Sequence, residues 1–304
     1  MIATFRRAAQ GLYDQPALLL ILTTLFWGGN VVAGQLANGE VAPFQLVFWR
    51  WILVAVTLWL LFGHEVRAHW NLARPKLLAI VVMATVGFTG FNGLFYLASL
   101  HTSGVNIGIL QGSMPVFVLI MAFFAYGSRV RVVQLAGVVA TMTGVVLVAT
   151  AGEPARLLTL GLNPGDAIML LACVFYSFYT TALQRRPALP GRAFFTLLAV
   201  VAAVTSAPVA LAEAVLTRPG LPTLEGWVIT LYVAIFPSCL SQLFFLRGVD
   251  LIGPGRAGVY VNLVPVFGAL MAVALLGQPV APYHGVALAL VLGGIWLAQR
   301  TTAR

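Results

Sequence analysis

The sequence predicts an all-α integral membrane protein with ten transmembrane helices, arranged as two inverted five-helix repeats. Three observations lead to this prediction: an apolar composition, ten apolar segments long enough to span a bilayer, and a constant internal offset. Of the 304 residues, 61% are hydrophobic and 8% are charged, and the mean hydropathy is +0.97. A soluble domain carries about 25% charged residues. Polar side chains are therefore too few to cover a water-exposed surface, which excludes a soluble enzyme.

Other classes are disfavoured by the same pattern. Disorder requires low hydrophobicity, and a β-barrel requires alternation rather than unbroken apolar runs. The net charge of +9 fits basic residues collected in cytoplasmic loops, so no nucleic-acid partner is expected. Cys173 and Cys239 both fall inside apolar segments without metal spacing, so no disulfide, metal site or cofactor is expected.

A helix that crosses about 30 Å of hydrocarbon needs roughly 20 apolar residues. The first such stretch follows Arg6 and Arg7 as a signal peptide would, but nine more spans come after it, which predicts a retained helix. The ten predicted spans are Ala17–Ala37, Pro43–Gly63, Lys76–Ser99, Gly104–Phe124, Val133–Ala151, Pro164–Gln184, Ala193–Ala214, Gly226–Leu246, Gly255–Leu276 and Tyr283–Gln299.

Loop charges predict the orientation of these spans. With the N-terminus in the cytoplasm, 14 of the 17 Lys and Arg residues fall in cytoplasmic loops and tails. Only Arg156 and Arg218 fall outside, and Arg50 lies within a span. Because basic residues favour the cytoplasmic side, the chain is expected in the inner (plasma) membrane, spanning the bilayer many times, with both termini in the cytoplasm.

A shift of 150 residues aligns the two halves without a gap. Pro115–Phe117 falls on Pro265–Phe267, Gly108 on Gly258, and Phe95 on Phe245. The predicted domains are therefore residues 1–152 and residues 153–304, each one five-helix repeat. An odd number of spans places the second repeat upside-down relative to the first. Inverted repeats are typical of alternating-access carriers, whose site lies near the midplane between the halves.

Several short motifs now carry a family resemblance. Phe26–Asn30 in the first span, Pro43 with Phe48–Arg50 in the second, and the two Pro-Val-Phe tripeptides resemble the EamA family of the drug/metabolite transporter superfamily. Gly165-Asp166 before the sixth span fits as well. The resemblance covers nearly the whole chain, and the YddG-type amino-acid exporters are the first members for comparison.

The resemblance implies a ten-helix carrier of 5+5 inverted topology that exports small metabolites, among them amino acids. It also implies that Arg50 is an architectural feature of the second span. The family often has Gly-Glu after the fourth and ninth spans. This chain has Gly127-Ser128 and Gly277-Gln278 instead, a departure at helix ends, away from the expected cavity.

Polar side chains inside a span need partners or a water-filled cavity. At helical spacing, those of six spans gather on one face each, which predicts a central substrate-binding cavity of amides, hydroxyls and aromatic rings. Such a wall suits a zwitterionic or neutral small molecule. The alternative is that these groups only hydrogen-bond helices together. The predicted lining residues are Trp27, Asn30, Thr89, Asn92, Tyr96, Asn106, Ser113, Tyr176, Tyr179, Ser241, Gln242 and Tyr260.

Three further residues are singled out by position. Arg50 lies about 10 Å from the outer end of its span. It is either a functional charge or a structural one that reaches the headgroups or helix-end carbonyls. Pro115 and Pro265 occupy repeat-related positions in mid-span, so paired bends are expected there, with a hinge role as the functional hypothesis.

The predicted function is a secondary transporter that exports amino acids, aromatic or otherwise neutral, or similar metabolites. A carrier of another cargo, such as a nucleoside, nucleotide-sugar, drug or lipid, is the alternative. An intramembrane enzyme or channel is disfavoured because no catalytic cluster or pore loop is found. No carboxylate lies well inside a span, which favours facilitated diffusion or exchange, although Asp166 or Asp250 could titrate at a cavity mouth. Since one chain holds both halves, a monomer suffices, and a dimer is equally compatible.

Overall fold

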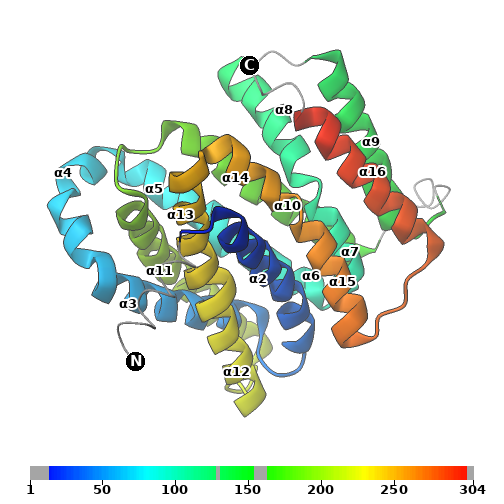
Figure 1. The fold of residues 1–304 in the computed structure, drawn as a ribbon. Helices are drawn as coiled ribbons and strands as arrows, with labels where there is room; N and C mark the ends of the chain where they lie inside the picture. The colour runs from blue at the N-terminus through cyan, green and yellow to red at the C-terminus, as the bar shows by residue number, and fades with distance from the viewer. Residues whose placement is uncertain (1–13, 128–130, 154–162, 300–304) are drawn as a thin grey trace, which may run out of the picture.

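The computed structural model describes residues 14–127, 131–153 and 163–299, and within these ranges the chain is helical, with no strand (Figure 1). In this part of the chain, nine helices are long and apolar enough to cross a membrane, and Pro282–Ala298 forms a shorter tenth. All ten predicted spans are confirmed as helical segments, with ends that differ by a few residues. The ten spans fall into two successive sets of five, one in each half of the chain.

Several spans consist of more than one helical segment. The first half contains α2 (Pro16–Leu36), α3 (Pro43–Ala68), α4 (Trp70–Ala73), η1 (Arg74–Lys76), α5 (Leu77–Ala84), η2 (Thr85–Gly90), α6 (Phe91–Ser99), α7 (Gly104–Gln111), α8 (Met114–Tyr126) and α9 (Val132–Ala149). The second half contains α10 (Pro164–Ala182), η4 (Leu183–Arg185), α11 (Gly191–Thr217), α12 (Leu224–Val233), η5 (Ala234–Leu240), α13 (Ser241–Ile252), α14 (Pro254–Val261), α15 (Val264–Leu276) and α16 (Pro282–Gln299).

Helix ends follow simple backbone rules. Pro16, Pro43 and Pro164 lie in the first turn of their helices, where a missing amide hydrogen costs nothing because that donor has no partner in the helix. Gly127 and Gly277 end the repeat-related helices α8 and α15 in the left-handed conformation, with φ of 64° and 63°. Only glycine adopts this φ without strain, so the glycine at each position stops the helix.

Two helix pairs join spans that correspond under the repeat. α3 packs along α11, and α9 packs along α16. The second contact is very close, because a Cβ atom built at Gly294 would lie 2.5 Å from the Gly137 carbonyl oxygen. Gly137, Gly144 and Gly294 therefore allow close helix contact, whereas Gly293 faces open space.

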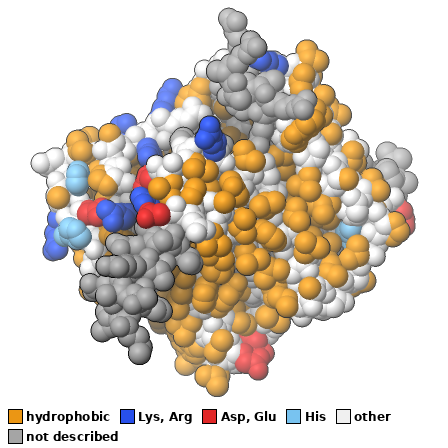
Figure 2. All heavy atoms as spheres, in the orientation of Figure 1, with side chains coloured by type: hydrophobic (Ala, Val, Ile, Leu, Met, Phe, Trp, Pro, Cys, Tyr) orange, Lys and Arg blue, Asp and Glu red, His pale blue; other side chains and the backbone are white. Residues whose placement is uncertain are grey.

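The outer surface is apolar, as a lipid-facing surface must be. Figure 2 shows hydrophobic side chains over most of the visible face, with charged ones gathered toward its edges. Leu60 and Phe124 are 79% and 80% exposed. In water such exposure would be unfavourable, but in a bilayer these side chains meet lipid tails.

Candidate functional site

Arg50 is buried among helices in the first third of α3, with only 5% of its surface exposed. All eight acidic residues of the chain lie in the described ranges, and none forms an ion pair with Arg50. Of the two alternatives for Arg50, a position at the headgroups does not hold, because its guanidinium group bonds to side chains inside the bundle. The site therefore contains one positive charge without a carboxylate partner.

Neutral side chains from both halves surround this guanidinium group. Nη1 donates hydrogen bonds to Asn92 Oδ1 at 2.7 Å and to the Tyr96 hydroxyl at 2.6 Å. Nε donates to Ser238 Oγ at 2.6 Å. Asn30 Oδ1 is farther from Nη1, at 3.4 Å, and accepts a hydrogen bond from Tyr96 at 2.8 Å. These five residues are called the Arg50 cluster below.

Members of the Arg50 cluster are themselves fixed by backbone groups. Asn92 Nδ2 donates to the Phe88 carbonyl at 2.7 Å, and Ser238 Oγ donates to the Val233 carbonyl at 2.5 Å. The guanidinium carbon also lies 5.4 Å from the centre of the Trp51 ring, within reach of a cation–π interaction. Burying an uncompensated charge costs several kcal/mol, which these contacts offset only in part. Such a cost is typical of functional sites in membranes.

Two π-helical turns flank the Arg50 cluster, one in each half. They are η2, residues 85–90, and η5, residues 234–240, and a shift of 150 superimposes the first on 235–240. Asn92 follows η2, and Ser238 lies within η5. In η5, the wider turn accommodates Pro237, which has no amide hydrogen. Because π turns are rare and concentrate at functional sites, their paired occurrence beside Arg50 makes the centre of the bundle the candidate functional region.

Aromatic side chains pack beside the cluster. The Trp27 indole donates to the Pro237 carbonyl at 3.0 Å, which ties α2 to η5. A second group begins at Trp51, whose ring centre is 4.8 Å from that of Phe88, and continues to Tyr179 at 5.0 Å and from there to Tyr176 at 5.6 Å. Trp51 and Tyr179 are nearly enclosed, so this second group acts as core packing next to the charge.

A second polar network lies at the end of the bundle predicted to face outward. Asp166, 1% exposed, accepts hydrogen bonds from Thr102 Oγ1 at 2.5 Å and from Asn106 Nδ2 at 3.2 Å. His284 Nε2 lies 3.1 Å from Asn106 Oδ1, and His284 Nδ1 accepts from the Ala281 amide at 2.9 Å. His284 is buried at this end of the bundle. It is 6% exposed, because α16 begins against α7.

This same end of the bundle is closed by contacts between the halves. Gln278 Nε2 donates to Gln35 Oε1 at 3.1 Å, and Gln278 Oε1 accepts from the Val105 amide at 3.2 Å. A Cβ atom built at Gly108 would lie only 2.7 Å from the Ala269 amide nitrogen, so α7 and α15 are in backbone contact. Its repeat partner Gly258, on α14, faces open space.

The structure divides the predicted lining residues into four groups. Asn30, Asn92 and Tyr96 meet at Arg50, with Trp27 beside them. A second group hydrogen-bonds elsewhere: Thr89 to α11, Asn106 to Asp166, Ser113 to Leu110 in its own span, and Ser241 to Thr23 and Phe236. Tyr176 and Tyr179 join the aromatic group, and neither Gln242 nor Tyr260 forms a hydrogen bond with a described residue.

Other observations bear on the remaining predictions. α7 ends at Gln111 and α8 begins at Met114, while α14 ends at Val261 and α15 begins at Val264. The chain therefore breaks just before Pro115 and Pro265, as expected of paired bends, and their hinge role stays a prediction. Ser238 is not among the predicted lining residues, because nothing in its span marks it as the partner of a residue 188 positions earlier.

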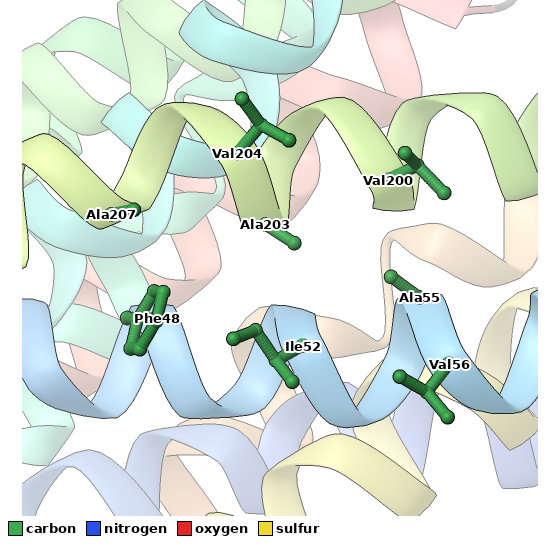
Figure 3. Close-up of a pocket in the computed structure, with 8 residues that line it drawn as sticks. All are labelled: Phe48, Ile52, Ala55, Val56, Val200, Ala203, Val204 and Ala207. Atoms are coloured by element: carbon green, nitrogen blue, oxygen red, sulfur yellow. The ribbon is translucent and has the colours of Figure 1, made fainter.

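A groove between α3 and α11 is unrelated to the Arg50 cluster. It measures about 500 Å³ and is lined only by apolar side chains (Figure 3), namely Phe48, Ile52, Ala55, Val56, Val200, Ala203, Val204 and Ala207. At 100° per residue, its α3 side chains lie on the face opposite Arg50. The groove therefore faces lipid and offers no polar group to a substrate.

Comparisons with known proteins agree with this architecture. The EamA-like transporter family matches residues 15–150 and again residues 163–299. The uncharacterized transporter YyaM of Bacillus subtilis is 26% identical over 93% of this chain and 92% of its own length. An uncharacterized transporter of Archaeoglobus fulgidus is 26% identical over 94% of this chain and 97% of its own.

Two further matches add detail. A protein of Streptantibioticus cattleyicolor named as a probable terminal-alkyne amino-acid exporter is 24% identical over 93% of both chains. A solved crystal structure aligns with a TM-score of 0.62, at 21% identity over 93% of this chain and 96% of that one, which shows the fold alone.

The double repeat, the membrane-spanning helices and the polar centre between the halves define a multi-pass membrane transporter. The chain belongs to the EamA-like transporter family. Its relatives are transporters, and it is not an enzyme.

Proposed function

We propose that this protein exports amino acids or similar small zwitterionic metabolites across the inner membrane by alternating access. The observation that carries the proposal is the Arg50 cluster, which joins side chains of both repeats between two repeat-related π turns. A site shared by two inverted halves can be opened to either side by moving one half against the other.

The contrast between the two ends of the bundle supports alternating access. At the predicted outer end, α7 and α15 are packed in backbone contact and Gln278 bonds to Gln35. The repeat-related helices α14 and α8 do not form a major packing pair within the described residues. This asymmetry is what an inward-facing carrier shows. Exchanging the roles of the two halves would give the outward-facing state.

The charge of the site bears on the cargo. A phosphate-bearing cargo carries up to two negative charges, which favours several cations in its site. Arg50 is the one cation buried among the described residues, while Arg256 on α14 is exposed. One charge with amide and hydroxyl neighbours suits a zwitterion. The S. cattleyicolor relative, named as an amino-acid exporter, supports the same cargo class. A carrier of nucleosides, drugs or lipids is the alternative.

The test is uptake into proteoliposomes. The purified full-length chain would be offered labelled phenylalanine, leucine, threonine, uridine and glucose 6-phosphate, each with and without a pH gradient. Uptake of an amino acid above protein-free liposomes, and its loss in Asn92→Ala with the fold retained, is the expected result. Gly285→Ala is the matched control, because Gly285 faces open space. Uptake of only uridine or only the sugar phosphate would overturn the amino-acid proposal.

A further inference from the structure

We propose that Arg50 binds the carboxylate group of the transported compound. This inference rests on the proposed function and names the substrate group that the site recognises.

Among the described residues, no carboxylate forms an ion pair with Arg50. The eight carboxylates of the chain are committed elsewhere or lie away from Arg50. Glu213 accepts from the Phe44 and Gln45 amides at the start of α3, and Glu65 pairs with Arg192. The acceptors that do reach Arg50 are all neutral. The buried guanidinium thus keeps its full positive charge, and an anion entering the site would gain an attraction strengthened by the low-dielectric surroundings.

The described residues engage only two of the three guanidinium nitrogens of Arg50. Nε and Nη1 are engaged by Ser238, Asn92 and Tyr96, whereas Nη2 forms no hydrogen bond with a described residue. Nη2 therefore offers two donors, and Nη1 has its longest contact, 3.4 Å, with Asn30. An incoming carboxylate can take Nη2 with one oxygen and replace the long Asn30 contact at Nη1 with the other. This is the bidentate geometry that guanidinium and carboxylate groups favour.

Contacts with neighbouring side chains fix the orientation of the guanidinium group. Asn92 and Ser238 bond to two different nitrogens of the guanidinium group, and each is itself fixed to a backbone carbonyl beside a π turn. The ring of Tyr96 lies 5.9 Å from the guanidinium carbon and limits its movement further. Arg50 is therefore oriented before a ligand arrives, so binding does not have to order a flexible side chain. Because Asn92 and Ser238 belong to different halves, a carboxylate bound here would contact the junction that transport must rearrange.

A purely structural role is the competing explanation, in which Arg50 only ties the two halves together. The two roles differ in what they predict for ligands. A structural tie is indifferent to the chemistry of the cargo. A carboxylate site discriminates each acid from the amide in which an uncharged group replaces the carboxylate, and the discrimination depends on the guanidinium group.

The experiment uses matched pairs of probes on the full-length protein. Phenylalanine, leucine and threonine are each compared with their amides, and phenylacetate is compared with phenylacetamide. Ligand-induced thermal stabilisation and proteoliposome uptake are both measured. In the native protein, the acid of at least one pair is expected to bind at least tenfold more tightly than its amide. In Arg50→Gln the two should differ less than twofold.

Two variants guard against misfolding and non-specific effects. Arg50→Lys keeps the charge but loses the planar fork, so it should weaken acid binding about tenfold even if Arg50→Gln does not fold. Arg256→Gln removes an exposed cation and should leave the discrimination unchanged.

The outcomes separate the two proposals. If amino acids and their amides enter the liposomes equally well, the role of Arg50 is overturned and the proposed function stands. Acid-specific stabilisation that depends on Arg50, without amino-acid uptake, would overturn the amino-acid function and keep the carboxylate site. An absence of acid-over-amide preference in all four pairs would overturn the inference.

Discussion

Gly108 and Gly258 occupy the same place in the two repeats, yet their surroundings differ, and this difference yields a sharp prediction. A Cβ atom at Gly108 would lie 2.7 Å from a backbone nitrogen of α15, where ordinary contacts begin at 3.4 Å. The helices would have to separate by about 0.7 Å at this point, and overpacking of this kind costs about 1–3 kcal/mol. At Gly258 nothing lies within 4 Å, so the same substitution meets no obstacle.

Gly108→Ala should therefore weaken the packing of α7 on α15, while Gly258→Ala should not. Both substitutions gain about the same helix propensity, so this contribution cancels in the comparison. A difference of 1–3 kcal/mol corresponds to a shift of about 5- to 150-fold in the equilibrium between closed and open outer ends. In transport terms, Gly108→Ala should populate the state in which the predicted outer end is open.

The assay is labelling of a single reporter cysteine by a membrane-impermeant maleimide. Ala272→Cys, in a background without Cys173 and Cys239, places the thiol on α15 against Gly104, at a position with 0% exposure. Labelling in proteoliposomes should be several-fold faster in the reporter protein with Gly108→Ala than in the one with Gly258→Ala or in the reporter protein without a glycine substitution. Equal rates in all three proteins would refute the view that backbone contact at Gly108 closes this end.

Two more predictions concern stability, and both are checked by thermal unfolding of the purified protein in detergent. Asp166→Asn should lower the free energy of unfolding by about 1–3 kcal/mol, since it replaces a buried acceptor of several hydrogen bonds. Asp250→Asn is the control, because Asp250 is exposed. Equal melting curves for the two variants would contradict the prediction. Gly294→Ala should cost about 1–3 kcal/mol, because its Cβ atom would meet the Thr141 hydroxyl and the facing backbone. The adjacent Gly293→Ala faces open space and should melt like the native chain, so similar losses in both would refute the close helix contact.

The sequence was sufficient to predict the spans, because spans depend on length and hydropathy, which are local properties. It also predicted bends at Pro115 and Pro265, since proline acts on its own backbone, although the structure places both prolines in the first turn of a new helix. The repeat offset of 150 was visible for the same reason, as glycines and prolines recur where the backbone requires them. The pairing of α3 with α11 and of α9 with α16 then follows from the symmetry.

The arrangement of polar side chains was harder to predict, and span 3 shows why. Helical spacing of 3.6 residues placed Thr89, Asn92 and Tyr96 on one face. In the structure Thr89 bonds to Thr205 on α11, while Asn92 and Tyr96 bond to Arg50. The π turn of residues 85–90 changes the register in between, and no residue type announces it. Ser238, the partner of Arg50 from the second half, lies in the other π turn, and for the same reason it is not among the predicted lining residues.

The unpaired charge of Arg50 also bears on how voltage acts on the carrier. A charge held deep in the bundle lies within the electric field of the membrane, and moving one charge fully across 100 mV changes its energy by about 2.3 kcal/mol. A zwitterionic cargo adds no net charge, so the empty and loaded carrier would respond to the membrane potential alike. A purely anionic cargo would cancel the charge of Arg50, and only the return of the empty carrier would then respond to voltage. Current recordings with phenylalanine and with phenylacetate would therefore differ in sign or size.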